Sequence, residues 1–218
     1  MADSAPRTRR NRQTETRERI LDAASAIVAE HGVGAATTKR IATTAGVAEG
    51  SLYNHFADKP HLLTALVMER LPGIRGVFGA LYGDAATIPL AERLAAGLEA
   101  LIGFYSAAQP IVAGISADPH LLDLCRKRFA ETGDGPQRAH EKLADFLEAE
   151  RQAGRMPADA DPAMLAALLI GACTEYASLA RIRGTPPSGQ SAGDYARAIV
   201  DTLSPLLIDT STSIPWRP

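Results

Sequence analysis

Residues 37–59, TTKRIATTAGVAEGSLYNHFADK, constrain the fold of this chain more than any other stretch, because they read as helix, tight turn and helix. Ile41 and Ala45 recur four residues apart, as on one face of a helix, and Ala42 is small enough for a close helix crossing. Gly46 follows and can adopt the positive φ of a turn. Two short helices joined by a turn of about 3 to 4 residues that contains a glycine are the pattern of a helix-turn-helix.

Both helices of this pattern carry further signals. Thr37 or Thr38 can cap the first helix with a hydroxyl group, and Val47, Leu52 and Phe56 form the inward face of the second. Small residues let a backbone approach base edges, and hydroxyl or imidazole groups reach phosphates, so the second helix is expected to enter a DNA major groove. Its outward residues are Ala48, Glu49, Gly50, Ser51, Tyr53, Asn54 and His55.

The order of residues closely resembles the DNA-binding segment of the tetracycline-repressor (TetR) family of bacterial transcription regulators. The resemblance covers residues 16–66, and beyond them only helix order and length are similar, so it does not imply what the rest of the chain binds. It implies that Lys59, at the start of the next helix, touches phosphate. The matching residues are Thr37-Thr38, Ile41-Ala42, Ala45-Gly46-Val47, Gly50-Ser51-Leu52-Tyr53, His55-Phe56, Lys59 and Leu62-Leu63.

The predicted DNA-binding residues divide into two roles. We expect Thr38, Tyr53, His55 and Lys59 to hold phosphates, and Lys39, Glu49, Gly50, Ser51 and Asn54 to read bases beside Ala48. Glu49 either accepts a hydrogen bond from a cytosine amino group or repels phosphate, so the operator sequence stays open. The alternative, a packing αα-hairpin, gives no reason to expose Tyr, Asn and His together.

The charge of the chain is unevenly distributed. Residues 1–60 hold nine Lys and Arg against seven Asp and Glu, whereas the remaining residues hold fourteen against eighteen. Residues 1–15 are expected to form a basic, flexible arm. Its first ten residues either follow the DNA backbone or form a solubilising tail.

We expect an all-α fold with a three-helix head at residues 16–60 and a larger regulatory and dimerisation domain at residues 61–210. The head begins with a helix from Thr16 that ends near Gly32, and Asp58 can cap the next helix. Whether residues 62–83 form one kinked helix is open, and residues 211–218 are expected to fray. Further helices are predicted at about 75–83, 89–108, 110–117, 119–132, 136–154, 162–183 and 192–208.

The helix that Asp161 can cap, ending near Arg183, is apolar nearly all round, so both of its faces need cover. The last helix carries a second apolar stripe, from Tyr195 to Leu206. Two such helices from each subunit would pair as a four-helix bundle, which is how TetR-like proteins dimerise. The alternative is a purely internal core helix.

A small-molecule effector would need an apolar cavity in the helical body. His120 and His140 are candidate polar anchors there, although isolated histidines usually lie at the surface. Each candidate lining residue also fits an ordinary core position, and the apolar set favours a hydrophobic effector over a sugar or nucleotide. The candidate lining residues are Phe104, Tyr105, Phe129, Phe146, Cys173 and Tyr176.

Several function classes find no support in the sequence. No window holds ~18 uninterrupted apolar residues and no signal peptide is evident, so we expect a cytoplasmic protein without a membrane partner. Cys125 and Cys173 are far apart, which predicts buried thiols, and no motif indicates a metal, cofactor or catalytic site. We therefore expect a homodimeric, ligand-responsive repressor that binds a pseudo-palindromic operator. The alternative is an all-helical small-molecule-binding protein or enzyme without operator binding.

Overall fold

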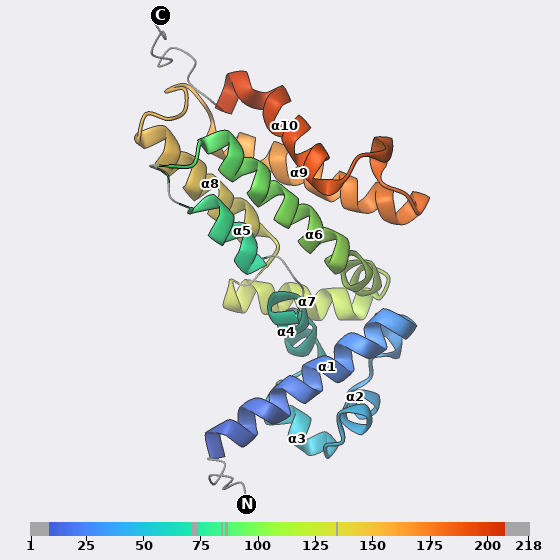
Figure 1. The fold of residues 1–218 in the computed structure, drawn as a ribbon. Coiled ribbons are helices and arrows are strands. Elements are labelled where there is room, and N and C mark those ends of the chain that lie inside the picture. The colour runs from blue at the N-terminus through green and yellow to red at the C-terminus, as the bar shows by residue number, and fades with distance from the viewer. Residues whose placement is uncertain (1–8, 71–73, 84, 86, 134, 208–218) are drawn as a thin grey trace, which may run out of the picture. The chain divides into compact units, whose positions relative to one another are not determined.

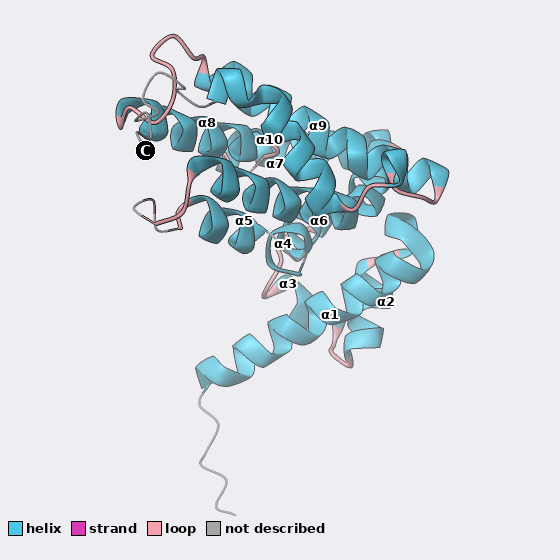
Figure 2. Cartoon of the chain, turned by 45° about the horizontal axis from the view of Figure 1, so that its top comes forward, coloured by secondary structure: helices cyan, strands magenta, loops and turns pink. Residues whose placement is uncertain are grey.

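The computed structural model of this 218-residue chain describes residues 9–70, 74–83, 85, 87–133 and 135–207. These residues form helices and loops without a strand, so the predicted all-α fold is confirmed (Figures 1 and 2). The first eight residues of the expected arm, and the expected frayed end at residues 211–218, lie outside this description. The helices are α1 (Arg9–Ala35), α2 (Thr38–Ala45), α3 (Glu49–Tyr53), α4 (Lys59–Arg70), α5 (Ile74–Leu81), α6 (Leu90–Ser116), α7 (Pro119–Thr132), α8 (Gln137–Gln152), α9 (Pro162–Arg183) and α10 (Ala192–Leu207), with a 3-10 turn η1 (Pro187–Gly189).

The helices group into two compact units. Unit 1 comprises residues 1–71 and 110–132, and unit 2 comprises residues 72–109 and 133–218. Unit 1 is larger than the expected head at residues 16–60, because its core takes side chains from α4 and α7 as well as from α1 to α3. Helix α6 contributes to both units, and the boundary falls immediately before its Pro110.

The core of unit 1 explains the apolar spacing of its sequence. Helix α1 packs against α2 and α4, α2 packs against α3, and α4 packs against α7 (Figure 1). The inward side chains predicted at Ile41, Leu52 and Phe56 are fully buried. Because these helices share one apolar core, the short α3 is held by tertiary contacts that its own length could not supply.

In unit 2, α5, α6, α8, α9 and α10 surround a second apolar core (Figure 1). Helix α8 packs along α9, and α9 also contacts α10 and η1. Leu94 and Leu98 of α6, Phe146 and Leu147 of α8 and Leu169 of α9 all belong to this core.

Several predicted helix ends are confirmed, because they depend on local chemistry. Asp161 Oδ1 accepts hydrogen bonds from the backbone N–H of Ala163 and Met164, which starts α9, and α9 ends at Arg183 as expected. The Asp58 carboxylate likewise accepts a bond of 2.7 Å from the N–H of His61 in the first turn of α4.

Two predicted boundaries are wrong. Helix α1 begins at Arg9, earlier than Thr16, and Gly32 with φ of 78° breaks it where a break was expected. One continuous α6 replaces the helices predicted at 89–108 and 110–117, because a proline removes a single helical hydrogen bond and buried Ala108 and Ile111 hold both sides of it. The open question of one kinked helix at residues 62–83 depends on residues 71–73, between α4 and α5, and these lie outside the described residues.

Helices α6 and α9 are long and apolar enough, by length and composition, to cross a membrane. Core helices of soluble proteins meet the same criterion. Leu94, Leu98, Leu169 and Ile170 are buried inside unit 2, and buried residues make up 33% of the apolar window of α6 and 39% of that of α9.

Candidate nucleic-acid interface and effector site

The turn between α2 and α3 is built as the sequence predicts. Thr37, and not Thr38, caps α2, since its side-chain oxygen accepts a bond of 3.2 Å from the backbone N–H of Arg40. Gly46 has φ of 64°, and its N–H bonds back to the last turn of α2. The left-handed glycine turns the chain sharply toward α3 at little steric cost.

Arg19 of α1 completes this turn. The Arg19 guanidinium donates hydrogen bonds to the carbonyl oxygens of Ala45 and Gly46, where α2 ends. Carbonyl groups at a helix end have no intrahelical partner, so this cation stabilises the turn. Arg17 is also engaged within unit 1: it pairs with Glu69, and its guanidinium carbon lies 4.9 Å from the Phe56 ring centroid. Neither arginine belongs to a free arm.

The residues predicted to touch DNA lie on α2, on α3 and the residues that flank it, and at the start of α4. Helix α3 ends at Tyr53, earlier than expected, because the chain turns there to bury Phe56. Asn54 is therefore the C-terminal cap residue of α3, and His55 follows the helix. Lys39, Ala48, Glu49, Gly50, Tyr53 and Asn54 are exposed, and Thr38, Ser51, His55 and Lys59 are half-buried.

Three of these side chains are connected by hydrogen bonds. The Thr38 hydroxyl donates to Glu49 Oε1 at 2.8 Å, and the Tyr53 hydroxyl donates to Thr38 Oγ1 at 3.4 Å. Both bonds meet at Thr38, the first residue of α2, and they join it to Glu49 and Tyr53, the first and last residues of α3. Sequence spacing does not reveal it, because the bonds join separate helices.

Two predicted phosphate contacts are partly desolvated. Lys59 Nζ donates a bond of 3.0 Å to the carbonyl oxygen of Val33, and burial lowers the pKa of its ammonium group against the opposing effect of Asp118. Burial also lowers the pKa of His55, and the positive charge of Arg17 lowers it further. His55 is therefore held neutral, with one ring N–H to donate.

Five of the six expected effector residues lie in unit 2, where they are core residues. Phe104, Phe146, Cys173 and Tyr176 are buried, and Tyr105 is half-buried. Phe129 instead packs against the core of unit 1, because α7 belongs to that unit.

The polar groups of these expected effector residues are either hydrogen-bonded within the protein or kept neutral by burial. The Tyr176 hydroxyl donates to the carbonyl oxygen of Gln190 at 2.9 Å. Burial raises the pKa of Cys173 to about 12, in line with the predicted buried thiols, and raises that of Tyr105 to about 12. Both groups therefore stay neutral at physiological pH, so these side chains offer an ionised ligand no charge. His120 and His140 are exposed.

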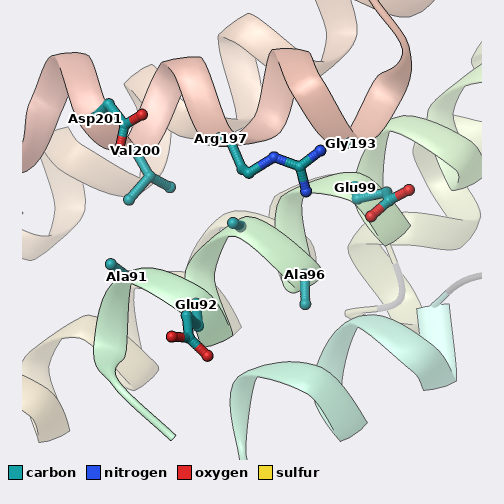
Figure 3. A pocket seen from close by; sticks show the side chains of 9 residues that line it. Ala91, Glu92, Ala96, Glu99, Gly193, Arg197, Val200 and Asp201 are labelled. Carbon is teal, nitrogen blue, oxygen red and sulfur yellow. The ribbon is translucent and has the colours of Figure 1, made fainter.

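Unit 2 also has an open groove between α6 and α10, with a volume of about 310 Å³ (Figure 3). Small residues line its floor, and Glu92, Glu99, Arg197 and Asp201 supply charge. Arg197 is paired with Asp194 at 2.7 Å. The predicted effector residues do not line this groove, which is lined by Ala91, Glu92, Ala95, Ala96, Glu99, Gly193, Arg197, Val200 and Asp201.

A buried ion pair in unit 2 is not evident from the sequence, because its two residues are far apart along the chain. Arg93 and Glu150 are almost fully buried and joined by hydrogen bonds of 2.8 and 3.1 Å. Arg93 also donates to the carbonyl oxygens of Leu81 and Ile88, and Arg155 makes a second ion pair with Glu150. Burial would raise the pKa of Glu150, but the hydrogen bonds from Arg155 and Arg93 outweigh it, and the net shift is downward.

Two protein-family descriptions match this chain. Residues 20–66 match the bacterial regulatory proteins of the tetR family, and residues 106–204 match the C-terminal domain of AefR-like transcriptional repressors. The chain belongs to the TetR family. Regulators of this family are soluble DNA-binding proteins, so the two long apolar helices of this TetR-family chain do not indicate a membrane protein.

Individual relatives agree with this assignment. The HTH-type transcriptional repressor KstR2 of Mycolicibacterium smegmatis is 32% identical over 126 residues, which are 56% of this chain and 59% of KstR2. This chain covers 31%, 28% and 59% of the lengths of three curated relatives, the last of which is KstR2. In the other two relatives the match is confined to 59 and 53 residues.

Solved structures share the fold. A TetR-family regulator from Rhodococcus sp. superposes with a TM-score of 0.66 at 20% identity, covering 87% of this chain and 98% of that one. FadR from Bacillus subtilis, solved in complex with stearoyl-CoA, superposes with a TM-score of 0.61 at 18% identity, covering 85% and 96%.

Proposed function

We propose that this TetR-family chain is a homodimeric, ligand-responsive repressor that binds a pseudo-palindromic DNA operator. The observation that carries the proposal is the surface of α2 and α3, where small and hydrogen-bonding side chains lie exposed beside Lys39 and Lys59. A helix bearing such groups fits a major groove, and flanking cations neutralise phosphates. Such a regulator acts on chromosomal DNA and is therefore cytoplasmic.

Dimerisation is proposed through α9 and α10. One face of α9 is buried in unit 2, but Met164, Leu168 and Ile182 are exposed on the other, so α9 is not a purely internal core helix. These residues recur at helical spacing, so they lie along one stripe with the small residues Ala167 and Gly171. Exposed apolar stripes on monomers mark interaction sites, and a two-fold partner would cover this one with the same stripe.

The effector is proposed to be a small, mainly apolar molecule that enters among the aromatic residues of unit 2. The proposed lining is apolar and uncharged, and it comprises Phe104, Tyr105, Phe146, Cys173 and Tyr176. FadR from Bacillus subtilis has been solved with an acyl-CoA, and it shares this fold. Phe129 is omitted from the proposed lining because it packs in unit 1.

Induction requires that the ligand binds one conformation of the dimer better than the other. Coupling of about 1 to 3 kcal/mol would change operator affinity roughly 5- to 150-fold. Helix α4 is the proposed lever, since Lys59 in its first turn is a predicted phosphate contact.

The test is binding of the purified full-length chain to its own upstream DNA and to a random duplex library. The proposal expects a salt-sensitive complex, with half-sites spaced by about one helical turn, ~10 bp or a multiple. The Phe104→Ala variant should keep operator affinity while losing release by an apolar ligand. A monomer that selects no palindrome would instead support a helical carrier or enzyme, although the similar proteins are named as regulators of transcription.

A further inference from the structure

The hydrogen bonds between α2 and α3 assign the Thr38 hydroxyl proton. Thr38 Oγ1 donates to Glu49 Oε1 at 2.8 Å and accepts from the Tyr53 hydroxyl at 3.4 Å. A threonine hydroxyl carries one proton. While Thr38 directs its one proton to Glu49, it cannot donate to a phosphate oxygen. While Tyr53 donates to Thr38, its own proton is not offered to phosphate either.

The receiving carboxylate remains able to accept further bonds. An ionised carboxylate has about four acceptor positions, and the bond from Thr38 occupies one of them. Glu49 is exposed on the first turn of α3, beside exposed Gly50, which has no side chain. Its charge disfavours a place against phosphates, so it requires a donor on the DNA that is not part of the backbone.

The major groove offers such a donor in two bases. Adenine presents its amino group beside the N7 acceptor, which repels the second carboxylate oxygen. Cytosine presents an amino group without an acceptor on the same base edge. A carboxylate held in one orientation therefore selects cytosine over adenine, and it rejects guanine and thymine, whose groove edges carry acceptors.

We propose that Thr38 is a positioning residue that holds the Glu49 carboxylate toward a cytosine amino group in each operator half-site. Tyr53 in turn fixes the Thr38 hydroxyl. Holding the glutamate before DNA binds reduces the side-chain entropy lost on binding, and the benefit applies only where the carboxylate finds its donor. This inference rests on the proposed operator binding, and it replaces the phosphate contacts predicted for Thr38 and Tyr53.

The experiment selects bound duplexes from a random library with the full-length chain, then measures dissociation constants for operators substituted at each half-site position. The variants are Thr38→Val, which removes the hydroxyl at nearly constant shape, Thr38→Ser, which restores it, Tyr53→Phe and Glu49→Gln. Wild type should prefer cytosine at one symmetry-related pair of positions by about 10-fold or more. Glu49→Gln should lose this preference or transfer it to adenine.

Thr38→Val should lose most of the preference at that same position and leave the other positions and the salt dependence unchanged, while Thr38→Ser restores it. Tyr53→Phe should have a smaller effect, because its bond to Thr38 is long. Uniform weakening by Thr38→Val, with base preferences intact, would identify a phosphate contact and overturn the inference. An unchanged preference in Glu49→Gln would overturn it equally. If the proposed operator binding itself is wrong, the wild-type protein will recover no shared sequence from the library. This result differs from the two above, and the inference would then be wrong as well.

Discussion

Lys59 donates a hydrogen bond of 3.0 Å from Nζ to the backbone carbonyl oxygen of Val33, tying the start of α4 to the end of α1. The bond lies beyond Gly32, where α1 breaks and leaves backbone carbonyl groups without helical partners. An ammonium group has three donors, so this contact leaves two for a phosphate oxygen. Lys59 can thus hold the head together and touch DNA at once.

Lys59→Ala is accordingly expected to affect both stability and DNA binding. Loss of the bond to Val33 should lower the free energy of unfolding by about 1 kcal/mol. Loss of one phosphate contact should weaken binding to every sequence and lower the salt slope by about one. Denaturant unfolding and salt titrations of the complex measure the two effects. Lys142→Ala in α8 is the control and should leave the slope unchanged; an unchanged slope in Lys59→Ala would assign this lysine to structure alone.

Gly114→Ala should destabilise unit 1, because a Cβ at this position would lie 2.6 Å from Val33 Cβ. The backbone sets the position of Val33 Cβ, so rotation of the side chain cannot relieve this contact, and a loss of about 1 to 3 kcal/mol is expected. Gly103 provides a matched control on the same helix, since a Cβ there meets nothing within 4 Å. Gly103→Ala should stabilise the chain by about 0.5 to 1 kcal/mol. Urea unfolding of both variants makes the comparison, and equal effects would show that Val33 accommodates the added methyl group.

Arg93→Met should destabilise unit 2 by about 3 kcal/mol, since it leaves part of the buried Glu150 charge uncompensated. It also removes the donor to the carbonyl oxygens of Leu81 and Ile88. Arg151→Met is the control, because its pair with Glu148 is more exposed and should matter little. Thermal unfolding of the two variants side by side measures the difference, and similar losses would contradict a special role for the buried pair.

The buried pair of Arg93 and Glu150 also predicts that acid destabilises the fold. Hydrogen bonds from Arg155 and Arg93 hold the folded-state pKa of Glu150 below its ordinary value despite burial. A carboxylate with a depressed pKa stabilises the fold above its unfolded pKa of about 4.3, and this contribution is lost as pH falls through the lower folded value. Unfolding free energies between about pH 6 and pH 3 should therefore fall less steeply in Glu150→Gln than in wild type. Equal slopes of unfolding free energy against pH in the two proteins would mean that Glu150 does not contribute to the loss of stability in acid.

Leu168→Asp is expected to separate the dimer by placing charge on the exposed α9 stripe, where Leu168 is 49% accessible in the single chain. Val112→Asp is a matched control on α6, with 52% accessibility outside the proposed interface. Sedimentation at micromolar concentration should show a monomer for the first variant and a dimer for the second. A dimer in both would place the interface elsewhere.

The parts of this protein that the sequence determined by itself are those set by neighbouring residues. Thr37 caps α2 and Asp161 caps α9, because each side-chain oxygen lies within reach of backbone N–H groups two or three residues further along the chain. Gly46 turns the chain because a residue without Cβ accepts positive φ. The apolar spacing then places Leu52 in the core, so the helix-turn-helix and the all-α fold follow from local rules and periodicity.

Only the tertiary structure decided which distant groups meet. The sequence places Arg17 and Arg19 in the first helix of the head without showing their partners, and packing of α1 brings them to Glu69 and to the end of α2. Phe129 has the composition of a pocket residue but lies in the other unit. The bond from Thr38 to Glu49 exists because the turn at Gly46 brings the starts of α2 and α3 together. Side-chain pairing depends on three-dimensional distance, which residue spacing along one helix does not encode.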